Sequence, residues 1–275
     1  TSRRWTAPRP KATAKWALAV LIDPKEEEGP SSAASIKRLA AVADKMGVEV
    51  EPIYPNEIAS LAEFDALFIR ATTAIDNFTY RFARRAEQEG MPVVDDTESM
   101  IRCTNKVYLK ELLDNARIPA PKTEILDDKS NFADVMERLG SPVVLKAPDG
   151  SFSRSVHKVA TLEEFQTTAK KLFADTALIL AQEYMPTQFD WRVGVLGGEP
   201  LFACRYKMAR GHWQIAKQQK DGGMSFGGTE TIAVEQAPKS VIDIAVKCAR
   251  LIGDGLYGID LKENERGVFV IEIND

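Results

Sequence analysis

Two stretches near the end of the chain decide the fold: GLYGIDLK (Gly255–Lys262) and VFVIEIND (Val268–Asp275). Both alternate apolar and polar residues, which is typical of strands with one buried face. In the first stretch, Asp260 is expected on the face opposite Ile259 and Leu261. In the second, the residues expected on the core face are Phe269, Ile271 and Ile273. Those expected on the other face are Val270, Glu272 and Asn274.

The polar face of these strands predicts a metal site. If the strands pair, the Asp260 carboxylate can approach that of Glu272, and the amide of Asn274 lies about 7 Å further along its strand. Two carboxylates and an amide oxygen suit a hard cation such as Mg²⁺, which also takes phosphate oxygens. A solvated strand face would show the same alternation, so both interpretations stay open here.

Two lysines occupy positions that an anion would explain. Lys146 ends the apolar run Pro142–Lys146, where a lysine either snorkels to water or meets an anion. Lys106 lies in the first turn of a helix predicted to run from a Thr104 cap to Asn115. The positive end of the helix dipole disfavours a cation there unless an anion binds. Ordinary surface lysines are the alternative.

The segments on either side of the next helix suggest nucleotide contacts. The polar loop 147–155 contains Gly150, Ser151 and Ser153, and its backbone N–H groups could cover phosphates. It is not a Walker loop, because no Gly-Lys-Ser or Gly-Lys-Thr follows. The segment AQEYMP (181–186) could be a hinge whose backbone reads adenine. An ordinary strand ending at Pro186 is the alternative.

Two further predicted strands carry charges in alternation. Asp190 and Arg192 are expected on one face of DWRVGV, and Arg205 and Lys207 on one face of LFACRYKM. These charges could form a surface salt-bridge ladder or a cationic site for a transferred phosphate. A cluster then precedes the glycine-rich DGGMSFGG, as in an active-site loop or a plain surface excursion. Its members are Arg210, His212, Trp213 and Lys217.

Composition limits the remaining possibilities. The 275 residues are 44% hydrophobic, and the net charge of −4 gives no reason to expect nucleic acid or an anionic membrane. No run of eighteen apolar residues occurs, which argues against a membrane span. Without a signal-peptide pattern, the three scattered cysteines predict a reduced, cytoplasmic protein.

The first hundred residues alternate strand and helix patterns after a basic, proline-containing linker (1–15). This alternation predicts a parallel sheet covered by helices. Arg70, Thr72 and Thr73 follow one of its strands, at the position where such sheets usually bind ligands.

The order of the motifs resembles the RimK-like ATP-grasp glutamate ligases. The series is NK (105–106), VVLK (143–146), a Ser/Gly loop, AQEYMP, DWRVGVL, ACRYKMARGHWQ, GLYGIDLK and VIEIND. The similarity covers residues 16–275 and is greatest to a subgroup with an additional N-terminal domain. It implies mixed α/β and α+β architecture, an ATP-grasp fold preceded by a parallel α/β pre-ATP-grasp domain. The implied boundaries are 16–102 for that domain, 103–186 for the N-lobe and 187–275 for a C-lobe truncated at its end.

The resemblance also implies roles for individual residues. Lys106 and Lys146 would bind the ATP phosphates under the loop that holds Gly150, Ser151 and Ser153. The other nucleotide contacts would be Gln182, Glu183, Tyr184 and Met185 at the adenine hinge, Asp190 at the ribose, and Lys207. Arg192 and Arg205 would face the transferred phosphate. Asp260, Glu272 and Asn274 would hold Mg²⁺, with Mn²⁺ as an alternative. Arg70, Thr72, Thr73 and His212 would contact substrate.

The activity implied is ligation of a carboxylate to an amine through an acyl phosphate, with an amino acid such as glutamate joined to a peptide, protein or small acceptor. Such chemistry needs cations and N–H groups rather than a covalent nucleophile. The chain stops where the family continues with Asn-Pro, and residues 214–228 depart from the family pattern, so substrate choice is expected to differ there. An ATP-grasp phosphotransferase, or a nucleotide-binding module without ligase activity, remain alternatives, and a homo-oligomer is left open.

Overall fold

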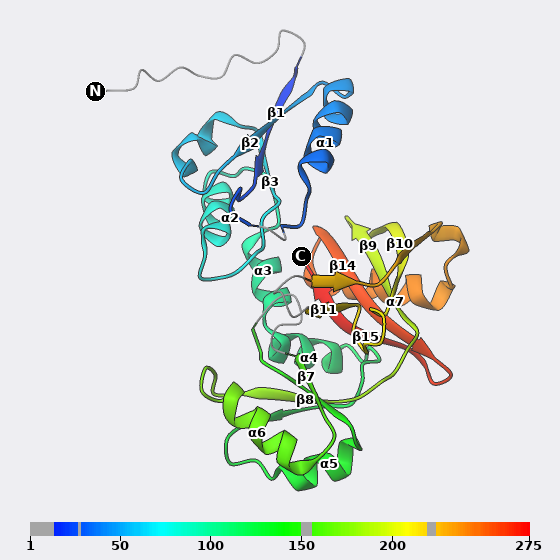
Figure 1. Ribbon diagram of the computed structural model, residues 1–275. Coiled ribbons are helices and arrows are strands. Elements are labelled where there is room, and N and C mark those ends of the chain that lie inside the picture. The colour runs from blue at the N-terminus through cyan, green and yellow to red at the C-terminus, as the bar shows by residue number, and fades with distance from the viewer. Residues whose placement is uncertain (1–13, 27–28, 150–155, 219–223) are drawn as a thin grey trace. The chain divides into compact units, whose positions relative to one another are not determined.

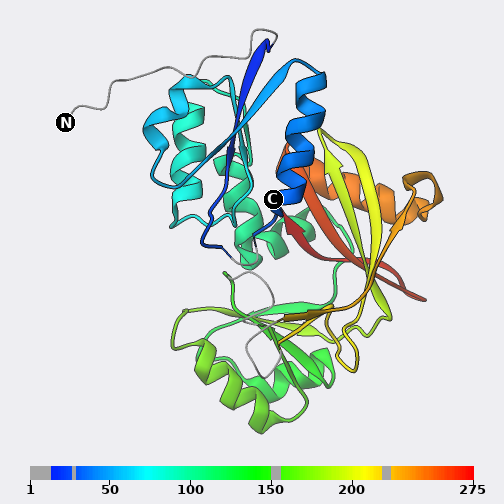
Figure 2. The same cartoon turned by 45° about the horizontal axis from the view of Figure 1, so that its top comes forward.

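The computed structural model describes residues 14–26, 29–149, 156–218 and 224–275. The chain divides into two compact units, Thr1–Ile101 and Arg102–Asp275. Figure 1 shows the elements coloured along the chain, and Figure 2 gives a second view of the same cartoon.

The first unit is built on a parallel sheet, as its alternating pattern predicts. Its strand order is β2-β1-β3-β4, from β1 (Trp16–Leu21), β2 (Val48–Ile53), β3 (Ala66–Ile69) and β4 (Val93–Val94). The connections hold α1 (Ala33–Lys45), the 3-10 helix η1 (Ile58–Glu63) and α2 (Phe78–Gln88). Ser32 caps α1 and Gly47, with φ of 75°, follows it, so this helix begins and ends at residues suited to those positions.

Helix α3 (Thr97–Thr104) spans the boundary between the units, and α4 (Lys106–Asn115) is the first helix that lies wholly in the second unit. The cap of α4 is Asn105, whose side chain accepts hydrogen bonds from the N–H groups of Val107 and Tyr108. The prediction of a Thr104 cap is therefore wrong by one residue, because Thr104 ends the preceding helix. Asn105 can accept both N–H groups through one amide oxygen.

Next comes an antiparallel sheet of order β5-β8-β6-β7. Its strands are β5 (Thr123–Leu126), β6 (Val143–Lys146), β7 (Val156–Val159) and β8 (Ile179–Glu183), and β6 pairs with β7 in antiparallel orientation. Helices α5 (Phe132–Leu139) and α6 (Leu162–Leu172) pack on one face around Phe165. The other face, which carries Lys146 and Gln182, is left for the site.

The last part of the chain forms a sheet of order β13-β10-β9-β14-β15. Its strands are β9 (Phe189–Leu196), β10 (Glu199–Lys207), β13 (Thr229–Ile232), β14 (Leu256–Asn264) and β15 (Gly267–Asn274). Helix α7 (Lys239–Ile252) covers one face, where Trp191, Tyr257 and Ile259 are buried. A short hairpin of β11 (Ala216–Gln218) and β12 (Met224–Phe226) and the 3-10 helix η2 (Val234–Gln236) complete the unit.

A β-bulge in β15 changes which of its residues face the core. Asp260 pairs with Glu272, but the next residue of β14, Leu261, pairs with Val270, so Ile271 is an extra residue. The buried residues of β15 are accordingly Val268, Val270 and Ile273. The expected core face of Phe269 and Ile271 is wrong for both, because strict alternation fails across the bulge, while Glu272 and Asn274 keep one face.

None of the helices in the described ranges has the length and apolar character that crossing a membrane requires.

Candidate active site

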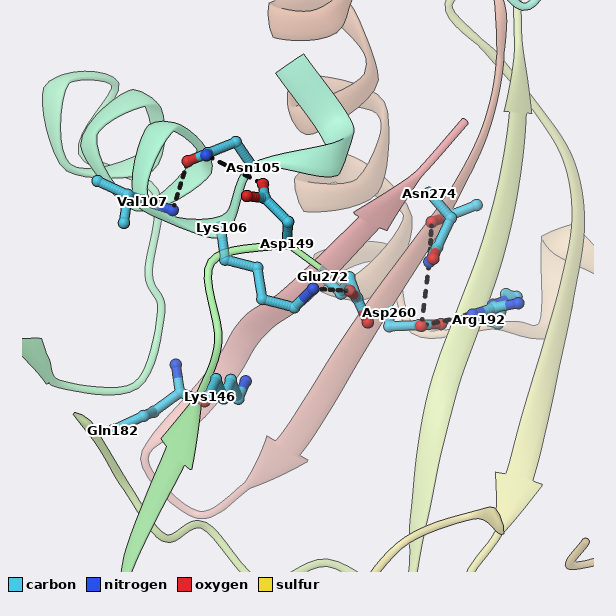
Figure 3. Close-up of polar contacts among 11 residues, drawn as sticks. Asn105, Lys106, Val107, Lys146, Asp149, Gln182, Arg192, Asp260, Glu272 and Asn274 are labelled. Atoms are coloured by element: carbon cyan, nitrogen blue, oxygen red, sulfur yellow. Dashed lines mark hydrogen bonds and ion pairs between the residues drawn. The ribbon is translucent and has the colours of Figure 1, made fainter. Parts of the chain in front are cut away.

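A bidentate ion pair lies at the centre of the polar face of the last sheet (Figure 3). Arg192 donates from Nε and Nη2 to the two carboxylate oxygens of Asp260, at 2.6 and 2.5 Å. The Tyr206 ring centre lies 5.2 Å from the guanidinium carbon. Burial raises the pKa of Asp260, and the Arg192 guanidinium opposes that rise. The pair is thus held in a partly dehydrated position next to a free sheet face.

A second carboxylate meets the first across the strand pair. Glu272 lies directly opposite Asp260, and its Oε1 is 3.2 Å from Nζ of Lys106. The Asn274 amide donates to Oδ2 of Asp260 at 3.2 Å. Strand register and helix α4 therefore bring together all three residues expected to hold metal and one of the two expected phosphate-binding lysines.

The start of α4 is tied to the loop that follows β6. The backbone N–H of Lys106 donates to the carbonyl of Pro148 at 2.9 Å, and the side chain of Asn105 donates to Asp149 at 3.1 Å. These bonds place the positive end of the helix beside the first residues of the loop. Gly150, Ser151 and Ser153, predicted to cover phosphates, lie outside the described residues.

Lys146 extends from β6 toward the same region. Its Nζ donates to Oε1 of Gln182 at 2.8 Å, and Gln182 donates to Thr123 at 2.8 Å. Burial, together with the charges of Lys106 and Lys262, lowers the pKa of Lys146 to about 8, although Glu272 and Asp190 oppose this. A group whose ammonium form is disfavoured in this way gains most from an incoming anion.

A third lysine completes the cationic set, and the sequence prediction missed it. Lys262 donates from Nζ to Oδ1 of Asp190 at 2.6 Å and to the Thr187 hydroxyl at 2.8 Å. It follows Asp260 by two residues on β14, so strand alternation alone could have placed it on the same face.

A pocket of about 660 Å³ is lined by two of the three lysines and by apolar side chains. Lys106, Lys146 and Gln182 line it together with apolar side chains, which are Leu109, Leu113, Leu139, Leu180, Val270 and Ile271. Its remaining lining comes from α4, α5 and residues 120–124, with charged side chains at Lys110, Asp114, Lys122, Glu124 and Arg138. A pocket that combines apolar side chains with lysines suits a flat aromatic base attached to an anion.

The donor set fits magnesium. Asp260 and Glu272 offer carboxylate oxygens from paired strand positions, and Asn274 offers an amide oxygen from the same face. Among the residues in the described ranges, no three His, Cys, Asp or Glu side chains group as a metal site would need. Two protein carboxylates with room for phosphate oxygens are typical of Mg²⁺, which seldom uses an all-protein cage.

The predicted hinge residues divide between different contacts. The Glu183 carboxylate accepts from the Lys122 N–H at 3.0 Å and pairs with Arg266 at 3.2 Å. Tyr184 contacts Trp213 edge to face, and Nζ of Lys158 lies 4.7 Å from its ring centre. Met185 is buried. Of the four, Gln182 lines the pocket.

Arg205 lies away from the site, contrary to expectation. It pairs with Trp191 in the strand register, and its guanidinium lies 4.6 Å from the Trp191 ring centre and 4.8 Å from that of Phe189. Arg192 instead pairs with Cys204, so the two arginines occupy opposite faces. Lys207 shares the face of Arg205 and is exposed. The register between β9 and β10 puts Arg205 on this face, and the alternation of residues within one strand does not determine that register.

The expected substrate residues lie in two places. In the first unit, Arg70 donates to Ser31 and to the carbonyl of Pro30, both at 2.8 Å, and the Thr72 N–H donates to Glu26 at 3.1 Å. Burial lowers the pKa of Arg70. Thr73 follows in the same loop. In the second unit, His212 contacts Gln214 at 3.1 Å, beside Trp213.

Known proteins share this architecture. The model of the RimK-like ATP-grasp domain matches residues 103–275. Alpha-aminoadipate–LysW ligase LysX from Saccharolobus solfataricus is 30% identical over 263 residues, covering 86% of this chain and 87% of the relative. A probable alpha-L-glutamate ligase 1 from Shewanella amazonensis is 25% identical over 258 residues, covering 87% and 83%.

Solved structures agree on the fold. A D-alanine–D-alanine ligase from Bacillus anthracis has a TM-score of 0.70 and 18% identity, with 94% of this chain and 86% of that chain covered. A RimK domain ATP-grasp protein from Sphaerobacter thermophilus has a TM-score of 0.69 and 19% identity, with 94% and 90% covered. The chain therefore belongs to the RimK-like ATP-grasp family and is an ATP-dependent, ADP-forming carbon–nitrogen ligase.

Proposed function

We propose that the protein joins an amino acid such as glutamate to a peptide, protein or small acceptor through an acyl phosphate. The observation that carries this proposal is the convergence of two lysines on a pair of facing carboxylates. Lys106 contacts Glu272, Glu272 lies opposite Asp260, and Lys146 lines the same pocket as Lys106. This combination suits a triphosphate with its metal.

ATP is proposed to bind with its base in the pocket and its phosphates at the lysines. The apolar side chains of Leu180 and Ile271 support a stacked base, and Gln182 offers it an amide. Lys106 and Lys146 would meet the phosphates, and Asp190 the ribose. Backbone groups of Glu183, Tyr184 and Met185 would read the adenine edge, while the Glu183 side chain stays with Arg266.

Asp260, Glu272 and Asn274 would hold Mg²⁺, and a metal ion held there would compensate the negative charge of the phosphates. Arg192 pairs with Asp260, and Lys106 pairs with Glu272. A metal ion held by the two carboxylates would compensate their charge, and both cations would then be able to meet phosphate oxygens.

The reaction proposed has two displacements. A substrate carboxylate oxygen attacks the γ-phosphorus, the bond to ADP breaks, and an acyl phosphate forms. The amine nitrogen then attacks the acyl carbon, the tetrahedral intermediate collapses with loss of phosphate, and the nitrogen loses a proton. Arg192, which pairs with Asp260 beside the proposed metal site, would stabilise the negative charge that develops on the transferred phosphate, and such stabilisation accelerates phosphoryl transfer.

The substrate class rests on the named relatives. One relative is named for α-aminoadipate and the other for L-glutamate, both acidic amino acids. Cationic and hydroxyl side chains suit a carboxylate-bearing substrate, and the candidates for contacting it are Arg70, Thr72, Thr73 and His212. The described hairpin residues 216–218 and 224–226 lie within the segment 214–228, where the sequence departs from the family.

The test is product analysis by mass spectrometry after incubation with ATP, Mg²⁺, an amino-acid pool and short peptides ending in glutamate. The expected result is an amide product with one ADP and one phosphate for each bond formed. A phosphate ester would assign a phosphotransferase, and ATP binding without any product would assign a binding module. Asp260→Asn should abolish turnover, while Asp243→Asn, an exposed change on α7, should leave it unchanged.

A further inference from the structure

We propose that Lys262 is a positioning residue for the ribose of the nucleotide, holding the Asp190 carboxylate in the orientation that receives the ribose hydroxyls. The inference rests on the proposed function, in which Asp190 meets the ribose. It adds a residue that the sequence did not single out and a specificity that follows from it.

Lys262 and Asp190 form one of two neighbouring cross-strand ion pairs of opposite orientation. In the first pair, the cation Arg192 is on β9 and the anion Asp260 on β14. In the second, two residues away along each strand, the anion is on β9 and the cation on β14. The alternating signs neutralise the face and keep each carboxylate beside its own cation rather than beside the other carboxylate.

Among the residues that the structure describes, all hydrogen bonds to the Asp190 carboxylate reach one of its two oxygens. Oδ1 accepts from Nζ of Lys262 at 2.6 Å and from the Thr187 hydroxyl at 2.8 Å, and Lys262 also donates to that hydroxyl at 2.8 Å. This closed triangle fixes the side-chain torsion of Asp190. Within the described part of the chain, no donor reaches Oδ2, which is left for an external hydroxyl group.

The arrangement suits a sugar diol better than a phosphate. A carboxylate is an acceptor, so it binds hydroxyl groups and repels phosphate oxygens. Lys262 donates two of its three ammonium N–H groups to Asp190 and Thr187, whereas Lys106 and Lys146 line the pocket itself. The Lys262 and Asp190 side chains are 14% and 18% exposed, so the carboxylate is shielded enough for its orientation to persist.

The experiment compares nucleotides that differ in the sugar alone. Binding of Mg-ATP and Mg-2′,3′-dideoxy-ATP is measured by isothermal titration calorimetry for the wild type, Lys262→Met and Lys262→Arg. The wild type is expected to prefer ATP about tenfold, the value of one well-made charge-assisted hydrogen bond. Lys262→Met should lose this preference by weakening ATP about tenfold while changing dideoxy-ATP less than about twofold. Lys262→Arg, which keeps the donors, should restore most of it.

Two controls keep the result clear. Lys239→Met removes the same charge from an exposed pair on α7 and should change neither affinity. The double variant Asp190→Asn/Lys262→Met removes both charges, so no unpaired carboxylate remains to disturb folding, and it too should bind both nucleotides equally.

An equal loss for ATP and dideoxy-ATP in Lys262→Met would overturn the proposal, because it would assign Lys262 to the phosphates. A wild type that binds both nucleotides equally would overturn the ribose role while leaving the ligase proposal intact. A wild type that binds neither would overturn both.

Discussion

Replacing Lys146 by methionine is expected to stabilise the ligand-free protein and to weaken its binding of ATP. Methionine keeps most of the length of the side chain and its apolar stem, and it removes the ammonium. Burial lowers the pKa of Lys146 from 10.5 to about 8. The charged form is therefore less stable in the folded protein than in the unfolded chain, and this cost disappears in the variant.

The magnitude follows from that pKa and from one hydrogen bond. The difference from 10.5 corresponds to about 3 kcal/mol at ~1.4 kcal/mol for each pH unit. The variant also loses the bond from Nζ to Gln182, which is worth about 1 kcal/mol. At pH 7 the second unit of Lys146→Met should thus be about 2 kcal/mol more stable than that of the wild type.

The difference should depend on pH with a defined sign. Between about pH 8 and 10.5 the unfolded chain holds the lysine proton more often than the folded protein does, so wild-type stability rises with pH relative to the variant. The gap should be full at pH 7 and reduced to less than half at about pH 9.5. Comparing the two proteins cancels the titration of other groups.

The assay is urea unfolding read by hydrogen exchange of peptides from β6 and β8, because a chain with two units can unfold in steps. Calorimetry with Mg-ATP supplies the binding measurement, and an affinity loss of about a hundredfold is expected for a removed phosphate contact. A variant less stable than the wild type at pH 7, or a gap that does not shrink toward pH 9.5, would refute the reasoning.

Three further expectations follow from the same contacts. Because an anion raises the lowered pKa of Lys146, binding of ATP at pH 8 should be accompanied by the uptake of about half a proton. Calorimetry in buffers of different ionisation enthalpy measures this uptake and should find none at pH 6.5. Arg192→Met leaves Asp260 without its bidentate partner and should lower the free energy of unfolding by about 2 kcal/mol. The double variant Arg192→Met/Asp260→Asn should recover this stability, and a failure to recover would contradict the pairing. Gly194→Ala would bring a Cβ within 2.1 Å of the Phe202 ring, so urea unfolding should show a free energy of unfolding lower by about 2 kcal/mol. Adding Phe202→Ala should relieve this loss, and an unchanged unfolding midpoint in Gly194→Ala would contradict the packing.

The local residue patterns predicted several of the strands that carry the candidate site. Alternation along β14 and β15 placed Asp260 and Glu272 on polar faces, and the apolar run before Lys146 located a strand that ends in a cation. Such signals are readable because side-chain direction repeats with a fixed period along each element. The same alternation along β14 places Lys262 on the face of Asp260, although the sequence prediction does not include Lys262 in the site.

Where prediction failed, the missing information was a relation between elements. The strand β5 and helix α5 were not anticipated, and Asn105 rather than Thr104 caps α4 because an unforeseen helix ends at Thr104. The resemblance to the family implies that Arg205 and Arg192 both face the transferred phosphate. The pairing of Arg205 with Trp191 puts it on the opposite face.

The sequence by itself determined the alternation of strands and helices in the first unit, the strands that carry the candidate site residues, the residue types able to meet ATP and metal, and, through the order of its motifs, the family. Tertiary structure alone decided which of those residues meet. The register of β9, β10 and β14 places Arg192, and not Arg205, beside Asp260. The bulge at Ile271 leaves Glu272 opposite Asp260, while Val270 is buried in the core. The reason is that a one-residue change in pairing moves a side chain to the other side of a sheet, and no pattern within a single strand records that choice.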